Sequence, residues 1–485
     1  MKRDLLGHLD GWAGASVERA IGAHHRRRLR RAGRVAQLDP PRDEGLWAAG
    51  DPPPRAGCEL EILIDGSQAL PRIAAALAGA RSHVHIAGWH VTPDFGLTRD
   101  DAAQPLRDLL GELAERLDVR VLLWAGAPLR VFTPDRAEVR RVRERLTRGT
   151  RIRCELDSHE RPMHCHHEKL VIVDGEIAFV GGIDLTSLGG DRFDSNDHPM
   201  RGRLGWHDAA SCIRGPAVAD VAEHFAARWH AVTGERLPAT APPPPAGAHE
   251  VQVLRTVPEH VYEFMAQGDF RILEAYTRAL RSARELVYLE SQFLWSAQVV
   301  EILAAKLRTP PSDDFRVIVL LPAKPNNGAD STRGQIGALI DADEKGGGGR
   351  FLATTIGARS GRLAGPLYVH AKVAVVDDRW LTLGSANLNE HSFFNDTEMN
   401  VVTCDPALAR DTRLRLWAEH LECPIEDVSG PPREVFDGLW RPIAAEQLAL
   451  ARADAPRRHR LQELPGVSRR SLALLGPLDS LLVDG

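Results

Sequence analysis

One segment of this chain occurs twice in similar form, and this repeat constrains the fold more than any other feature of the sequence. H-E-K-L-V-I-V-D at 167–174 recurs as H-A-K-V-A-V-V-D at 370–377, and a pair of small residues follows each copy at 181–182 and 384–385. The two histidines lie 203 residues apart, as do the similar stretches ARSHVHIA and ARELVYLE that begin at Ala80 and Ala283. A constant offset of this length is too long for a solenoid and predicts two halves with the same plan.

Strand-like apolar runs alternate with helical stretches from about residue 57, and this alternation predicts α/β layering. Four successive prolines at 242–245 divide the halves, because Pro-rich segments are extended and do not enter central strands. The basic run at 24–31 is interpreted as a solvated helix face or a disordered tail, with a dock for anionic headgroups as the alternative. We predict an N-terminal extension (1–56), a first domain (57–236), a linker (237–249), a second domain (250–450) and a tail (451–485).

Each motif copy supplies groups that suit an attack on phosphorus. His167 and Lys169 are two apart on a predicted strand and share one face, so imidazole and ammonium converge on one phosphate. The same holds for His370 and Lys372 in the second copy. One histidine can attack while the other protonates the leaving group, and the two lysines can hold the phosphate oxygens.

The aspartates of the motif are included among the candidate catalytic residues, although the geometry argues for another role. Asp174 and Gly175 predict a two-residue hairpin turn. Asp174 would then lie roughly 20 Å along the strand from His167. We therefore expect Asp174 and Asp377 chiefly to organise their turns or to pair with a basic group.

Four polar residues downstream of the motifs are candidates for binding phosphate or orienting the histidines. Asp184 and Asn387 each lie 17 residues after the histidine of their own copy. Asp208 and Glu398 could each accept the Nδ1 proton of the histidine in their own half, which fixes the tautomer and raises the basicity of Nε2. The alternative is that they are ordinary capping or surface carboxylates.

Composition excludes several classes. The formal net charge is -5, and no basic stripe lies outside the N-terminal region, which argues against a nucleic-acid partner. No apolar run approaches the roughly 20 residues needed to span a bilayer, and no signal-peptide pattern opens the chain, so we expect a cytoplasmic or peripheral membrane location. The stretch H-C-H-H at 164–167 alternates its side chains on a strand and does not form a metal site. We expect no metal and no cofactor.

The repeated pattern H-x-K-x4-D-x6-G-[GS] resembles the signature of the phospholipase D superfamily. In that signature an asparagine follows, and Asn387 matches it, whereas the first copy has Asp184 in its place. The W-H-D at 206–208, Y-L-E-S-Q-F at 288–293 and the stretch from Leu321 to Gln335 resemble the longer, lipid-acting members.

The resemblance implies two α/β/α sandwich domains with the active site at their interface. It also implies a metal-free, two-step displacement in which His167 is the nucleophile and His370 the acid and base. Lys169, Lys372 and Asn387 would stabilise charge on the phosphate oxygens.

The expected substrate is a glycerophospholipid at a membrane surface, with water or an alcohol as acceptor, acted on by a monomer. The alternatives are cardiolipin-synthase-type phosphatidyl transfer and, less favoured, a nucleic-acid phosphodiesterase. A non-enzymatic binding protein is a further alternative, against which both intact His-x-Lys pairs argue.

Overall fold

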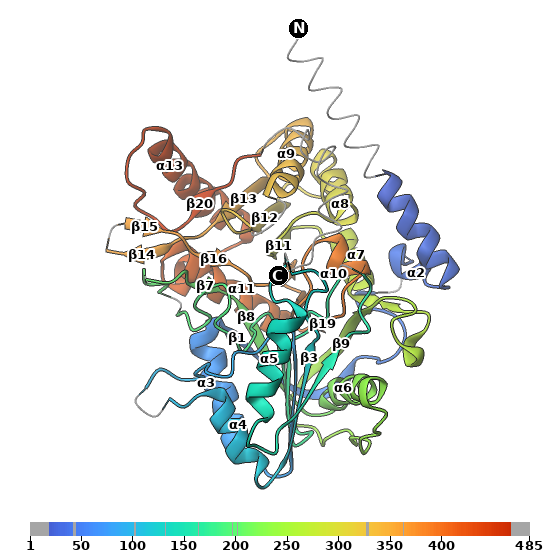
Figure 1. The fold of residues 1–485 in the computed structure, drawn as a ribbon. Coiled ribbons are helices and arrows are strands. Elements are labelled where there is room, and N and C mark those ends of the chain that lie inside the picture. The colour runs from blue at the N-terminus through green and yellow to red at the C-terminus, as the bar shows by residue number, and fades with distance from the viewer. Residues whose placement is uncertain are drawn as a thin grey trace.

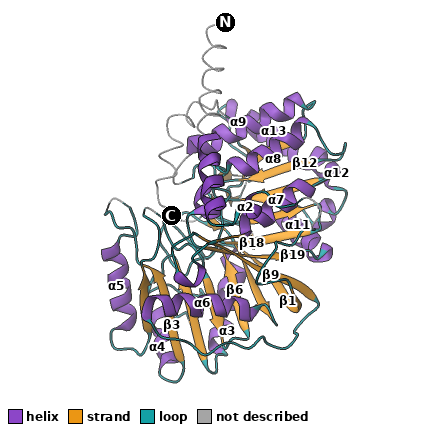
Figure 2. Ribbon diagram, turned by 90° about the vertical axis from the view of Figure 1, so that its right-hand side faces the viewer, coloured by secondary structure: helices purple, strands orange, loops and turns teal. Residues whose placement is uncertain are grey.

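The computed structural model describes residues 19–41, 45–100, 103–130, 132–162, 164–195, 197–200, 202–325, 329–361 and 363–466, with side chains in the 329–361 segment from Thr332 onward. The sequence-predicted α/β class is confirmed, because strands and helices alternate through both halves (Figure 1). Helices cover the outside of both halves, and the strands run through the middle (Figure 2).

The first half builds a seven-stranded part of the sheet with four helices. Its parallel strands β2, β3 and β4 follow one another through crossover helices, as a βαβ plan requires. The elements are β1 (Arg55–Ile64), α3 (Asp65–Ala78), β2 (His83–Gly88), α4 (Leu106–Ala114), β3 (Asp118–Trp124), α5 (Arg136–Thr147), β4 (Arg153–Asp157), β5 (Leu170–Val173), β6 (Ile177–Gly181), β7 (Trp206–His207), β8 (Ala209–Arg214) and α6 (Val218–Thr233).

The second half repeats this order from residue 249. Its elements are β9 (His249–Val257), η1 (Glu263–Met265), β10 (Asp269–Phe270), α7 (Arg271–Ser282), β11 (Leu286–Glu290), α8 (Ala297–Arg308), β12 (Arg316–Leu320), α9 (Ala329–Lys345), β13 (Phe351–Thr355), β14 (Ala358–Ser360), β15 (Leu363–Gly365), β16 (Tyr368–Val369), β17 (Val373–Val376), β18 (Trp380–Gly384), α10 (Glu390–Phe394), β19 (Glu398–Thr403), α11 (Pro406–Leu421), η2 (Ile425–Val428), α12 (Pro432–Val435), η3 (Phe436–Trp440), α13 (Arg441–Arg452) and β20 (Gln462–Glu463).

The two halves share one continuous sheet, a feature that the sequence did not predict. The strand order is β20-β13-β12-β11-β17-β18-β19-β9-β1-β8-β6-β5-β2-β3-β4, so β9 pairs with β1 at the centre. Read outward from this pair, each strand of the first half has its counterpart in the second, β5 matches β17, and β20 is an additional strand at the far edge of the second half. A smaller cross-connection pairs β7 of the first half with β16 of the second. The strand after each motif therefore occupies an equivalent place in its half.

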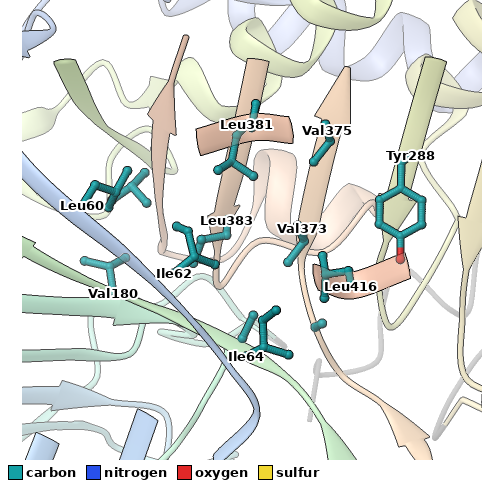
Figure 3. Close-up of a cluster of buried hydrophobic side chains, with 14 of the residues drawn as sticks. Leu60, Ile62, Ile64, Val180, Tyr288, Val373, Val375, Leu381, Leu383 and Leu416 are labelled. Atoms are coloured by element: carbon teal, nitrogen blue, oxygen red, sulfur yellow. The ribbon is translucent and has the colours of Figure 1, made fainter. Parts of the chain in front are cut away.

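One hydrophobic cluster joins the halves. In Figure 3, Ile62 and Ile64 of β1 lie beside Leu383 of β18 and Val373 of β17, so side chains from both halves fill the same core. All four are at most 2% exposed. Burying a side chain of this size contributes on the order of 2 kcal/mol, and the shared core thus holds the halves at a fixed distance.

Described segments near both ends of the chain contact the second half. Residues 19–31 form a helix in which Leu29 is fully buried, and the Arg28 guanidinium pairs with Glu259 at 2.8 Å. The interpretation of the basic run as a solvated face or disordered tail is therefore wrong for Arg28 and Leu29. In the predicted tail, Gln462 and Glu463 form β20, which pairs with β13 and extends the sheet of the second half. No helix among the described residues is long and apolar enough to cross a membrane.

Candidate active site

The two motif histidines lie together where the halves meet. His167 stands three residues before β5, and His370 three residues before β17. Their ring centroids are 6.5 Å apart with an interplanar angle of 70°. Both imidazoles are at most 5% exposed. This spacing lets two rings flank a single phosphorus atom, one on each side.

Backbone hydrogen bonds hold each motif against the opposite half. The His167 and Glu168 N–H groups donate to the Thr397 carbonyl at 2.9 and 3.1 Å. In the mirrored arrangement the His370 and Ala371 N–H groups donate to the His207 carbonyl, at 2.8 and 3.1 Å. The motif residues thus form extended segments before their strands, rather than belonging to the strands as the sequence predicted.

The acids that orient the histidines are exchanged between the halves. His167 Nδ1 lies 3.1 Å from both carboxylate oxygens of Glu398, at the start of β19 in the second half. His370 Nδ1 lies 2.6 Å from Asp208 Oδ2, directly before β8 in the first half. The sequence named both acids but placed each with the histidine of its own half, and that pairing is wrong. The reason is that β8 and β19 flank the seam, so each acid reaches across it.

Glu398 is held by two hydroxyl donors besides His167. The Ser392 hydroxyl donates to Oε1 at 2.6 Å, and the Ser385 hydroxyl donates to Oε2. Burial, together with the charge of Asp396, raises the pKa of Glu398 to about 8, against the opposing effects of Lys169 and the two serines. The sequence identified Ser385 only as a small residue and did not single out Ser392.

The surroundings of His370 are more cationic. Burial and then the charges of Lys372 and Arg192 lower the pKa of His370 well below its usual value. Burial raises the pKa of Asp208 to about 6, although Lys372 and the Ala209 N–H group oppose it. The lowered pKa favours the neutral imidazole of His370, whose Nδ1 faces Asp208.

The two lysines are fixed differently. Lys169 Nζ donates to the His167 carbonyl at 2.6 Å and lies 3.1 Å from Asp184 Oδ2. Lys372 Nζ donates to the His370 carbonyl. Asn387, the counterpart of Asp184, is hydrogen-bonded to the backbone and side chain of Gln292. The first copy thus pairs its lysine with the residue 17 positions after the histidine.

The structure does not bring Asp174 and Asp377 to the histidines. The carboxylate of Asp174 accepts backbone N–H groups from residues 81–83, before β2. Asp377 does the same for residues 284–286, before β11. Each lies in a three-residue loop, because Val173 pairs with Ile177 and Val376 with Trp380, so the predicted two-residue turn is wrong. The prediction that Asp174 and Asp377 are catalytic is therefore corrected: each joins its hairpin to the neighbouring strand.

Arg192 is a site residue that sequence reasoning missed. Its guanidinium is buried and stacks over Trp206, whose ring lies 4.6 Å from that of His370. Among the described residues, Arg192 Nε and Nη1 have no hydrogen-bond partner. Burial lowers the pKa of Arg192 to about 10, although Asp184 and Asp208 oppose this. No motif spacing marks Arg192, because it lies in a loop between β6 and β7.

Comparison with known families agrees with this duplicated arrangement. A model described as "Phospholipase D" matches residues 76–205, and one described as "Cardiolipin synthase, PLD-like domain" matches residues 276–417. The chain belongs to the phospholipase D superfamily. Each match contains one of the two motif histidines, and together the matches cover more than half of the chain.

Relatives of this superfamily protein carry several names. Phospholipase D A of Dictyostelium discoideum is 24% identical over 79% of this chain and 37% of its own length. Cardiolipin synthase A of Pseudomonas entomophila (strain L48) is 28% identical over 76% of this chain and 70% of its own length. The chain spans between about a third and two-thirds of the length of the phospholipases D that it matches. The phosphatidylserine synthase of Haemophilus influenzae Rd KW20 shares the fold, with a TM-score of 0.50, 13% identity, and coverage of 80% of this chain and 94% of that one.

Proposed function

We propose that the protein cleaves the headgroup phosphodiester of glycerophospholipids and transfers the phosphatidyl group to water or to an alcohol. The observation that carries this proposal is the pair of crossed units, His167 with Glu398 and His370 with Asp208, that face one another at 6.5 Å. A buried site with two oriented imidazoles suits an in-line displacement at phosphorus, in which one group attacks and another protonates what leaves.

In the first step His167 Nε2 attacks phosphorus, a P–N bond forms, and the P–O bond to the headgroup breaks. His370 gives its Nε2 proton to the departing alkoxide. The bound phosphodiester carries a negative charge, which offsets the lysine and arginine charges that lower the pKa of His370 in the free protein. Binding of substrate therefore favours the protonated imidazole that this step needs.

In the second step the roles reverse. His370, now neutral, takes a proton from water or an alcohol, whose oxygen attacks phosphorus and displaces His167. Lys169, Lys372 and Arg192 stabilise the charge that develops on the phosphate oxygens, and Asn387 donates to the same group through its amide. Glu398 accepts the Nδ1 proton of His167 and so leaves Nε2 as the free nucleophile.

The test is an incubation with phosphatidylcholine vesicles in the presence of ethanol. We expect phosphatidylethanol and free choline, with phosphatidate as the product of the competing hydrolysis. His167→Ala and His370→Ala should each abolish both products, with His85→Gln as a control for substitution of a buried histidine, one that stacks on Phe225 away from the motifs. Hydrolysis of DNA with inert lipid would overturn the proposal.

Phosphatidyl transfer of the cardiolipin synthase type is the second candidate. Two observations favour it: the family model that matches residues 276–417, and the cardiolipin synthase A that this chain covers for 70% of its length. The two functions use the same first step and differ only in the acceptor. Phosphatidylglycerol as sole lipid separates them, because only the second candidate yields cardiolipin and glycerol.

A further inference from the structure

A second cluster of ionisable side chains lies behind the candidate active site, and the proposed mechanism does not use it. Its four members come from four separate segments: Asp65 at the start of α3, His198 in the loop before β7, His207 on β7 and Glu419 on α11. Asp65, His198 and His207 are completely buried, and the side chain of Glu419 is 2% exposed. Three members belong to the first half and one to the second.

Four nitrogen–oxygen separations within the cluster, which involve both oxygens of Asp65, are about as short as those between ligands of one metal ion. His198 Nε2 lies 2.9 Å from Glu419 Oε1 and 3.5 Å from Asp65 Oδ2. His207 Nδ1 lies 3.0 Å from Asp65 Oδ1 and 3.4 Å from Glu419 Oε1. Ligands that surround Zn²⁺ tetrahedrally at about 2.0–2.1 Å are about 3.3 Å from one another. The two histidine rings also lie edge to face, at an interplanar angle of 84°.

Each histidine has a carboxylate on its other ring nitrogen. His198 Nδ1 lies 3.2 Å from Asp194 Oδ2, and His207 Nε2 lies 3.0 Å from Glu290 Oε2. Histidines that bind metals usually donate their second N–H group to a carboxylate or carbonyl, which orients the ring and raises its basicity. His207 has that support as a hydrogen bond to Glu290, whereas His198 and Asp194 lie only at ion-pair distance.

The charge of the cluster calls for a cation. Asp65, Glu290 and Glu419 form no ion pair with any lysine or arginine among the described residues. A comparable buried cluster in the first half, around Asp157 and Glu168, has Arg228 between its two carboxylates. Buried carboxylates need a positive partner, because an isolated buried charge is very costly. Arg228 supplies this positive partner to Asp157 and Glu168. Among the described residues, the cluster around Asp65 has only histidines as possible positive partners.

Two further observations concern residues of the same cluster. Asp65 Oδ2 and Glu419 Oε2 are buried and have no hydrogen-bond partner among the described residues. Asp65 and His198 also have left-handed backbone conformations, with φ of +61° and +41°. Such conformations cost about 1–3 kcal/mol each and persist where surrounding structure enforces them.

We propose that Asp65, His198, His207 and Glu419 bind one structural Zn²⁺ or a similar divalent transition-metal cation. Two carboxylates and two neutral imidazoles balance the charge of the ion. The bound ion ties the halves together at the residue next to Asp208, whose carboxylate holds His370. Protein ligands occupy all four tetrahedral positions around the ion, and the ion takes no part in the displacement at phosphorus. The sequence weighed only the stretch at 164–167 as a metal site, because these four ligands share no local spacing.

The first experiment measures metal content. The full chain, produced in zinc-supplemented medium and dialysed against metal-free buffer, should contain about one Zn²⁺ per molecule by inductively coupled plasma mass spectrometry. Glu419→Gln keeps the shape of a ligand but removes its charge, and it should lower the zinc content at least about tenfold. Glu290→Gln, which removes the carboxylate that contacts His207, Tyr288 and His420, should weaken zinc affinity about 10- to 100-fold.

The matched control is His224→Gln, a buried histidine that contacts Glu168 in the cluster with Arg228. This variant should retain the full zinc content. If Glu419→Gln fails to fold, wild-type protein stripped with a chelator gives the answer, since added Zn²⁺ should raise its Tm and restore one ion per chain.

Protons are the competing occupants of the cluster. Burial opposes a charged imidazole, but Asp65, Asp194 and Glu419 outweigh it and raise the pKa of His198 to about 9. Wild-type protein that holds no transition metal above about 0.1 per chain, and whose Tm is unchanged by Zn²⁺, Mn²⁺ or Co²⁺, would overturn the metal proposal in favour of protonated histidines.

Discussion

The two copies of the motif share a spacing and a place in the sheet, yet their surroundings differ. His167 pairs with a glutamate that two serine hydroxyls also contact, whereas His370 pairs with an aspartate near Lys372 and Arg192. Lys169 has Asp184 as a partner, and the second copy has Asn387 at that position. Duplication therefore preserved the geometry of the reacting groups, while the neighbouring residues came to differ. In the proposed mechanism, this difference separates the histidine that attacks from the histidine that protonates.

The strongest test of that division of labour replaces the leaving group. With a natural phospholipid, His167→Ala and His370→Ala should each lower kcat by at least about 10⁴-fold. With a p-nitrophenyl phosphodiester, whose leaving group needs no proton, release of p-nitrophenolate by His370→Ala should recover by at least about 10²-fold. The measurement is the burst of p-nitrophenolate in single turnover. Recovery in His167→Ala instead would exchange the two roles.

The exchanged acids provide the next largest effect. Glu398→Gln and Asp208→Asn keep the shape of each side chain but put an amide in place of the carboxyl group that contacts the histidine Nδ1. We expect kcat to fall about 10³-fold in each, with KM changed by less than about threefold. Trapping of the phosphohistidine after acid quench should show slower formation in Glu398→Gln. Equal KM and kcat changes would indicate that these acids only hold the fold.

Asp184 and Asn387 occupy equivalent positions but differ, and exchanging the two residue types tests whether this difference affects phosphate binding. Asp184→Asn makes the first copy like the second and frees Lys169 for the phosphate, so inorganic phosphate should inhibit about tenfold more strongly. Asn387→Asp adds a carboxylate to the second copy and should raise KM by a similar factor, because the new charge repels the phosphodiester. Unchanged inhibition in Asp184→Asn would show that Lys169 does not contact phosphate.

The raised pKa of Glu398 predicts a dependence of stability on pH. Burial and Asp396 raise this pKa from 4.5 to about 8, so between these values the folded protein holds a proton that the unfolded chain releases. The stabilisation from this group is complete below about pH 4.5 and is lost as pH rises through 8. The free energy of unfolding of the wild type should fall relative to that of Glu398→Gln by up to about 1.4 kcal/mol per pH unit in this window. Urea denaturation at pH 5, 6.5 and 8 measures it, and parallel curves for the two proteins would contradict the shift.

The smallest effect on activity is expected at the motif aspartates. Asp174→Ala and Asp377→Ala each remove the acceptor of three backbone N–H groups, far from the histidines. We expect a loss of about 1–2 kcal/mol in the free energy of unfolding and less than a twofold change in kcat at a temperature where the variants are folded. Glu176→Ala, beside the same turn, is the control. A hundredfold loss of kcat in folded protein would return these aspartates to the active site.

The features that could be predicted from the sequence are those that recur at a fixed spacing. The two His-x-Lys pairs, the equivalence of residues 184 and 387, and the alternation of strands and helices are local patterns, and each is readable from one segment of chain. Asp174 and Asp377 illustrate the same point, because the strand rise of about 3.3 Å per residue already separated them from the histidines.

What the sequence left open depends on how the halves meet. Asp208 and Glu398 were recognisable as acids, but their exchange follows from the pairing of β9 with β1, which brings β8 and β19 to the same seam. Arg192 lies in an irregular loop, and its position near His370 is a consequence of tertiary packing. The same holds for Asp65 and Glu419, which are 354 residues apart in the chain.

The central pairing of β9 with β1 has a consequence for the history of the chain. A single half carries one motif histidine and one orienting acid that cannot reach each other. Its chemistry is therefore complete only beside a second half. An ancestor of half this length would have needed to assemble as a twofold symmetric dimer, with each protomer lending its acid to the other. Fusion of two such genes would allow the two copies to diverge, and Asp184 and Asn387 differ at equivalent positions of this chain.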